Sequence, residues 1–164
     1  MTFRVAMLGT VALVCASCAK GPAKTSPNVQ TSLGTLAEAE RRVASDPANP
    51  EVALKTGEVA YFLTFKGKIA IADYEKGWEK RVPLLDSERR ELVPVLAGTP
   101  AVNGKLSQDK WTMNGNLTAS GGRWIFKGSA SVPDSTLVLA YVVPASAKGL
   151  ALKDGAASHP LGLD

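Results

Sequence analysis

The sequence predicts an α+β fold, with helices in the N-terminal half lying on a small antiparallel sheet in the C-terminal half. Three observations support this prediction. Apolar residues recur at helical spacing between residues 35 and 97. Further along, they alternate with polar residues at 111–118 and form an unbroken apolar run at 136–143. A stretch rich in Gly, Pro and Asn at 98–104 separates the two patterns, as is typical of a linker.

The composition indicates a globular chain and excludes several kinds of chemistry. The 164 residues are 45% hydrophobic and 21% charged, with a net charge of +4. The chain has two cysteines, Cys15 and Cys18, and one histidine, His159. A Cys/His metal site and a nucleophilic site with a buried histidine base are therefore excluded. We expect no catalytic residues, no metal and no cofactor. We also expect no nucleic-acid partner, because basic and acidic residues are interleaved along the chain.

The N-terminus has the features of an export signal. Met1–Arg4 is a short basic start, Val5–Val14 is an apolar stretch too short to span a bilayer, and small residues precede Cys18. This segment resembles the lipobox of bacterial lipoproteins, although that family usually has Leu at the position of Cys15. The resemblance implies a signal peptide at 1–17. It also implies that Cys18 carries acyl chains, palmitate among them. The chain would then be anchored in the inner or outer membrane, with its domain facing the periplasm.

A tether and several helices are expected after the signal. Residues 18–34 contain Lys, Pro, Gly, Ser and Thr but no acid, which is typical of a flexible tether. Thr35 and Glu38 form a capping-box pattern that begins the first of three to four helices. The second helix is expected to begin at the sequence Asn-Pro-Glu of 49–51, and the third and fourth are expected at 69–82 and 84–97.

Residues 36–83 resemble a tetratricopeptide repeat. The sequence DPANPE at 46–51 is similar to the linker of that family, and Ala70, Tyr74 and Gly77 match its small–aromatic–small spacing in the second helix. The resemblance implies a hairpin of two antiparallel helices whose small residues allow close approach. A single repeat cannot bury its own apolar faces, so the C-terminal half or a partner must cover it.

The same resemblance implies a candidate groove for an envelope protein partner. Four residues of the second helix fall on the surface that binds peptides in that family: Leu54, Glu58, Tyr61 and Phe65. Grooves of this kind use apolar anchors together with a polar group. The alternative is that this stripe packs against the β half, and we also expect the three Trp side chains to lie in the core.

The C-terminal half is expected to form an antiparallel meander. Strands are predicted at 111–118, 123–130, 136–143 and 150–152, with the run at 136–143 at the centre. Short pieces of this half resemble the C-terminal domain of the tetratricopeptide subunit of the bacterial cytochrome c maturation system, which receives unfolded apocytochrome. The pieces that carry this resemblance are 113–118, 133–140, 150–153 and 160–164.

Together these patterns predict five segments and one class of function. The segments are a signal peptide at 1–17, a tether at 18–34, a helical region at 35–97, a linker at 98–105 and a β region at 106–164. We expect a non-enzymatic lipoprotein, anchored in the bilayer through acylated Cys18, that acts as an interaction scaffold or assembly factor. The resemblance of the C-terminal half would make the protein a cytochrome c maturation factor. The alternative is a structural envelope lipoprotein without a peptide-binding groove.

Overall fold

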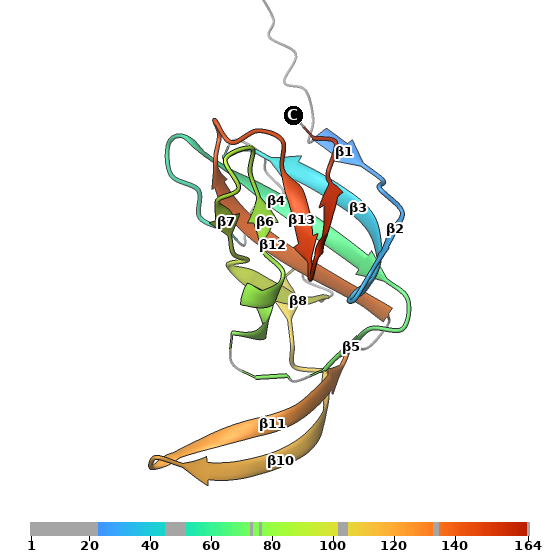
Figure 1. The fold of residues 1–164 in the computed structure, drawn as a ribbon, viewed down its shortest axis with the longest axis vertical. Helices are drawn as coiled ribbons and strands as arrows, with labels where there is room; N and C mark the ends of the chain where they lie inside the picture. The colour runs from blue at the N-terminus through green and yellow to red at the C-terminus, as the bar shows by residue number, and fades with distance from the viewer. Residues whose placement is uncertain are drawn as a thin grey trace, which may run out of the picture.

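The chain folds into antiparallel β-sheets. The computed structural model describes residues 23–44, 52–72, 74–75, 77–101, 105–132 and 135–163, without the side chains of Arg123 and Trp124. Within these ranges no α-helix occurs, and the one helical turn is a 3₁₀ turn, η1 (Trp78–Arg81). The described residues form three sheets: one with seven strands, one with four and one with three (Figure 1).

The seven-stranded main sheet has the order β1-β3-β4-β12-β8-β9, and β2 also pairs with β3. All pairs in it are antiparallel. Its strands are β1 (Ala23–Thr25), β2 (Val29–Thr31), β3 (Gly34–Arg42), β4 (Glu58–Lys66), β8 (Leu96–Pro100), β9 (Leu106–Ser107) and β12 (Thr136–Pro144). The sheet therefore combines strands from both sides of the linker that the sequence predicts.

The four-stranded sheet covers one face of the main sheet (Figure 1). Its strands, in the order β14-β13-β6-β7, are β14 (Ala157–Pro160), β13 (Ala151–Asp154), β6 (Leu84–Leu85) and β7 (Glu91–Leu92). The main hydrophobic core lies between the two layers, because Leu84 and Leu152 of the smaller sheet belong to the same buried cluster as Phe65 and Leu139. This arrangement is a two-layer β-sandwich.

Strands β4 and β12 form the centre of the sandwich and are covered on both faces. Tyr61 and Tyr141 lie opposite each other on the two strands and point into the main core. The hydroxyl of Tyr141 donates a 2.7 Å hydrogen bond to the carbonyl oxygen of Val82, which ties the segment before β6 to the main sheet. Phe62 and Val138 belong to a second, smaller cluster on the opposite face. The predicted central position of 136–143 is confirmed.

The third sheet stands apart from the sandwich. It consists of β10 (Thr112–Ser120), β11 (Arg123–Ser131) and the short strand β5 (Ala70–Ile71), in the order β10-β11-β5. The first two strands form a long hairpin that projects from the body at the end opposite β1 (Figure 1). The turn between them has positive φ at both Gly121 and Gly122, as a two-residue hairpin turn requires.

The predicted α+β fold is wrong, and β3 explains the first error. Leu36 and Ala39 are both fully buried in the main core, although strand residues three apart normally point to opposite faces. A register shift between Leu36 and Glu38 inserts an extra residue in β3. This bulge gives a strand the three-residue apolar spacing of a helix. Pairing with β4 on one side and with β1 and β2 on the other overrides the helix propensity of Ala and Glu.

The second predicted helix is strand β4. Tyr61 and Phe65 are four residues apart, a spacing that puts two side chains on one face of a helix and equally on one face of a strand. The intervening residues decide between the two, because Val59 and Leu63 point into the same core while Ala60 and Phe62 point to the opposite face. The run is the sequence of a strand buried on both faces.

The remaining predicted helices are also absent from the described residues. The third is replaced by β5 and the turn η1, because Gly77 has a left-handed φ of 87° that a continuous helix does not allow. The fourth is replaced by β6 and β7, with the turn between them passing through Arg89 at φ 61°. The tetratricopeptide resemblance is therefore wrong, since its helix pair does not exist.

The strands predicted in the C-terminal half are present, but their connection differs. Strands β10, β11, β12 and β13 lie at the predicted places. The meander is wrong because β12 pairs with β4 and β8 instead of with β11. The C-terminal half therefore contributes strands to all three sheets. The cytochrome c maturation resemblance, which assumed helical repeats joined to a meander, is withdrawn with them.

Candidate functional site

The four residues of the predicted groove lie at different places around β4. Tyr61 and Phe65 are 2% and 0% exposed and belong to the main core. Leu54 is partly buried and packs against the second cluster, on the other face of the sheet. Glu58 accepts a 2.8 Å hydrogen bond from the backbone N–H of Lys55. The structure brings Tyr61 and Phe65 together inside the protein and leaves the other two outside that core.

The projecting hairpin β10–β11 is the most exposed part of the described chain. All nine residues of β10 are exposed. Residues that lie directly opposite in the ladder share a face, so the pairing Leu117↔Phe126 defines one face and Asn116↔Lys127 defines the other. The first, called here the apolar face, consists of Met113, Gly115, Leu117, Ala119, Phe126, Gly128 and Ala130.

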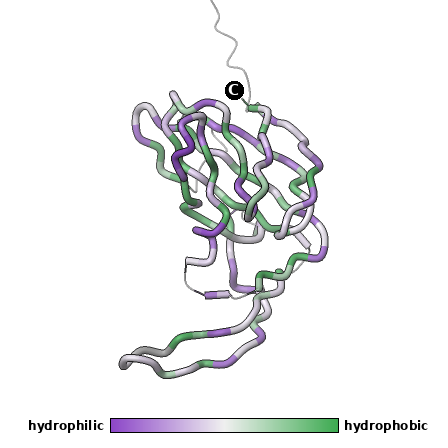
Figure 2. Tube along the Cα trace, viewed as in Figure 1, coloured by the Kyte–Doolittle hydropathy of each residue, from purple (hydrophilic) through white to green (hydrophobic). Residues whose placement is uncertain are grey.

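The apolar face presents large side chains to solvent. Leu117 is 65% exposed and Met113 is 43% exposed. Figure 2 shows hydrophobic segments on both strands of the hairpin, well away from the body. The opposite face carries Thr, Asn and Ser residues together with Lys127 and the 38% exposed Ile125. An amphipathic hairpin whose apolar face is uncovered at Met113 and Leu117 is typical of a surface that contacts another molecule.

The base of the hairpin is held by an aromatic cluster. The ring of Tyr74 lies 6.2 Å from that of Phe126 and 6.2 Å from that of Trp111. The backbone N–H of Tyr74 donates a 2.7 Å hydrogen bond to the carbonyl oxygen of Gly128. The indole N–H of Trp111 donates a 3.0 Å bond to the hydroxyl of Thr99 in β8. These contacts fix the root of the hairpin on the sandwich, while its outer part extends into solvent.

Two opposed glycines set the close approach of the hairpin strands. Gly115 and Gly128 lie directly opposite each other. A β-carbon on Gly128 would collide with the backbone carbonyl oxygen of Asn114, and one on Gly115 would collide with that of Lys127. The ring of Phe126 also reaches over Gly115. Neither position admits a side chain without separating the two strands.

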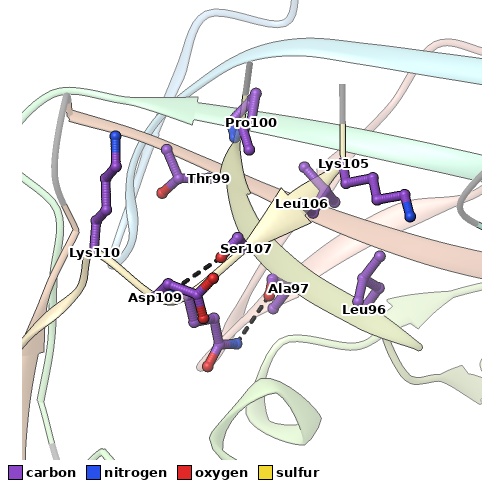
Figure 3. Close-up of a pocket in the computed structure, with 11 residues that line it drawn as sticks. Leu96, Ala97, Thr99, Pro100, Lys105, Leu106, Ser107, Asp109 and Lys110 are labelled. Carbon is purple, nitrogen blue, oxygen red and sulfur yellow. Dashed lines mark hydrogen bonds between the residues drawn. The ribbon is translucent and has the colours of Figure 1, made fainter. Parts of the chain in front are cut away.

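An open hollow of about 1010 Å³ lies beside the base of the hairpin, along β8 and β9 (Figure 3). Lys105 and Lys110 flank it. Gln108 lines the hollow, and both ends of its side-chain amide already make hydrogen bonds within the protein. The NH₂ group donates to the carbonyl oxygen of Ala97 at 2.8 Å, and the amide oxygen accepts from the hydroxyl of Tyr74 at 3.0 Å. These polar groups position the segment before β10 rather than a ligand.

The buried carboxylates among the described residues are paired with cations. Burial raises the pKa of Glu40, but hydrogen bonds and charge from Arg42 and Lys24 outweigh it, and the net pKa lies below the ordinary value. For Asp86, burial is likewise outweighed by backbone N–H donors and by the guanidinium of Arg90 at 2.6 Å, so this pKa is also lowered. Both carboxylates are therefore structural ions.

Other candidate groups take structural positions. His159 lies in β14, and its Nε2 atom is buried without a hydrogen-bond partner. Trp78 and Trp111 are buried, while the side chain of Trp124 lies outside the described residues. No group of three His, Cys, Asp or Glu side chains in the described ranges is placed to hold a metal ion. Cys18, the predicted lipidation site, lies outside the described residues.

Sequence reasoning missed the hairpin as a candidate site, although it predicted both strands. The alternation of Met113, Gly115 and Leu117 with polar residues was interpreted as a half-buried strand. One signal that could have corrected this is that two of the four positions on this face of β10 are Gly115 and Ala119, which offer little area to bury. The absence of charge from β10 is a second signal, because exposed strands usually carry charged residues.

The comparisons with known proteins add no relative. No family model, no curated protein and no solved structure gives a significant match to this chain. Within the described ranges, no helix has the length and hydropathy needed to cross a bilayer. The site is therefore interpreted from its own geometry.

Proposed function

We propose that this protein is a lipid-anchored, non-catalytic envelope protein that acts as an interaction module through the hairpin β10–β11. The observation that carries the proposal is the uncovered outer part of the apolar face of the hairpin, where Leu117 is 65% and Met113 is 43% exposed. The base of that hairpin is fixed to the sandwich by Tyr74, Trp111 and Phe126. A rigid projecting element with exposed apolar side chains is typical of a surface that binds another molecule.

The position of the predicted anchor supports an outward role for the hairpin. Cys18 lies five residues before Ala23, where β1 begins. Five residues span at most about 18 Å, so acylation at Cys18 would hold β1 close to the bilayer. Because β1 and the hairpin lie at opposite ends of the molecule, the hairpin would point away from that bilayer (Figure 1).

The absence of catalysis is part of the proposal and has its own support. The buried carboxylates Glu40 and Asp86 are neutralised by neighbouring cations, which lowers their pKa values. A general acid or base working near neutral pH needs the opposite shift for a carboxylate. Neither residue has the properties of such a catalyst.

A second candidate is a structural envelope lipoprotein without a peptide-binding groove. The burial of Tyr61 and Phe65 favours it, because the two aromatic anchors of the predicted groove are inside the protein. The two candidates share the anchor and differ in whether the hairpin contacts a defined partner. An experiment on the anchor and an experiment on the hairpin are therefore needed.

The anchor is tested by labelling cells with a palmitate analogue. We expect the parent chain to incorporate the label and fractionate with membranes, and Cys18→Ser to lose both properties. The matched control is Cys15→Leu, which restores the residue usual in the lipobox family and should retain the label. Labelling of Cys18→Ser at the parent level would refute the anchor.

The hairpin is tested by crosslinking the full chain in the envelope and identifying what is captured. Leu117→Ser removes an apolar side chain of the hairpin that is 65% exposed, and Val95→Ser removes one that is 56% exposed elsewhere. We expect Leu117→Ser to lose the captured partner and Val95→Ser to keep it. Equal capture by both variants would refute the hairpin as the interaction element and leave the structural candidate.

A further inference from the structure

Strand β10 is an open sheet edge of unusual composition. It is the terminal strand of its sheet, so within the described residues its outer N–H and C=O groups have no strand partner. Its sequence, TMNGNLTAS, is nine residues long and contains no Pro and no charged residue. Its pairing with β11 is continuous over all nine residues, without a bulge. Proteins normally protect a long edge strand with a proline, a charged side chain or a bulge. An edge without them readily pairs with another strand.

We propose that β10 pairs with β10 of a second copy of this chain, antiparallel and centred on Asn116. This inference rests on the proposed function in taking the hairpin as the interaction element, and it does not depend on the anchor. The pair would extend the two hairpins into one continuous sheet, with strand order β11-β10-β10-β11. Such edge-to-edge pairing is an isologous contact, in which both copies use the same surface.

The register follows from length and from the shape of the side chains. Asn116 is the midpoint of Thr112–Ser120, so centring the pair there matches all nine residues of one strand with all nine of the other. Gly115 then lies opposite Leu117 of the second copy, which places that exposed side chain against a residue with none and beside the ring of Phe126, which reaches over Gly115. Polar residues meet polar residues on the other face, and the apolar faces of the two copies join.

Charge favours a second copy over an unrelated strand as the occupant. Two copies of β10 bring no charges together, because the strand has none. The cation nearest the centre, Lys127, lies on β11, opposite Asn116 within its own hairpin. In the dimer the two Lys127 residues are separated by both β10 strands, or about 14 Å, which is beyond the ~8 Å screening length at physiological salt.

The register is tested by disulfide crosslinking of full-chain variants that each carry one added cysteine. Directly opposed residues of an antiparallel pair have Cα atoms ~4.5–5.5 Å apart, which is within disulfide range. We expect Asn116→Cys to form a disulfide dimer by itself. Asn114→Cys and Thr118→Cys should not do so alone but should crosslink when the two variants are mixed. The parent chain controls for Cys15 and Cys18.

A charge variant tests the interface without weakening the hairpin. Asn116→Glu puts a carboxylate opposite Lys127 within one copy, which stabilises the hairpin, but opposite an identical carboxylate across the dimer axis. We expect dimer dissociation to become about fivefold more favourable. The matched control, Asn114→Glu, lies opposite Thr118 of the second copy and should dissociate as the parent does. Mixing Asn116→Glu with Asn116→Lys should restore association.

The outcomes separate this inference from the proposed function. A chain that stays monomeric by light scattering to ~100 µM, or that crosslinks equally at 114 and 116, overturns the self-pairing. A hairpin-dependent heterologous partner would then still support the proposed function. Conversely, a dimer that forms equally with Cys18→Ser supports the self-pairing even where the anchor fails.

Discussion

The replacement of Phe65 by Ala distinguishes the core position of this residue from the predicted surface groove. Phe65 is 0% exposed and lies on β4 in the main core, between the two sheets of the sandwich. Removing a fully buried Phe loses ~2–3 kcal/mol of transfer free energy and leaves a cavity, which together cost about 3–5 kcal/mol. A domain of this size has ~7–20 kcal/mol of stability in total, so the variant should remain folded but be greatly weakened.

The assay is urea unfolding of the purified protein, followed by the fluorescence of the buried Trp78 and Trp111. We expect the free energy of unfolding to fall by about 3–5 kcal/mol and the melting temperature by ~10–15 °C. The matched control is Phe126→Ala, which removes a half-buried ring at the base of the hairpin and should cost about 1–2 kcal/mol. A loss below about 1 kcal/mol for Phe65→Ala would refute the core assignment and return the residue to the surface.

Three further predictions concern the hairpin, the join between the sheets and the response to acid. Gly128→Ala should separate the hairpin strands and cost ~1–3 kcal/mol locally, seen as faster amide exchange in β10 with the sandwich unchanged. Tyr141→Phe should lower the unfolding free energy by ~1–2 kcal/mol, because the carbonyl of Val82 loses its donor; an unchanged urea midpoint would contradict this. The pKa of Asp86 is depressed below its ordinary value of 3.8, so its ionised form stabilises the fold above that value, and this contribution is lost as pH falls through the folded-state pKa. Asp86→Asn should therefore reduce stability at pH 7 and flatten the loss of stability below about pH 4, and parallel pH curves for the two proteins would disprove the assignment.

The sequence was sufficient to predict the strands whose patterns have one interpretation. The run at 136–143 is apolar without alternation, and β12 is the central strand that such a run predicts. The strands predicted at 111–118 and 123–130 are β10 and β11, and Gly121 and Gly122 between them have the positive φ of a two-residue hairpin turn. In both cases the local pattern and the tertiary environment require the same structure.

The helical half failed where local signals have two interpretations. The spacing of Tyr61 and Phe65 suits a helix face and a strand face equally, and the bulge in β3 gives Leu36 and Ala39 a helical spacing within a strand. Only pairing partners from distant parts of the chain resolve the ambiguity. For β4 that partner is β12, whose paired residues are 70 to 86 positions away along the sequence. Its pairing could not be predicted from the local pattern.

The candidate site shows the same limit. The alternation in β10 predicted two faces correctly, but not whether anything covers the apolar one. That depends on where the hairpin lies relative to the sandwich, which the contacts of Tyr74 with Phe126 and Gly128 decide. No spacing within residues 112–131 encodes those contacts.

The proposed anchor and the proposed self-pairing constrain each other through geometry. Strand β11 lies between β10 and the body of each copy, so two copies joined at β10 have their bodies on opposite sides of the shared edge (Figure 1). Each β1 lies at the far end of its own body, and Cys18 can reach only about 18 Å beyond Ala23. Two acylated copies paired in this way would therefore be attached to two facing bilayers. Acylated protein in liposomes should then cluster the vesicles, and Asn116→Glu should shift the clustering to about fivefold higher protein concentration. Dimers without clustering would mean that at least one of the two proposals, the anchor or the register, is wrong.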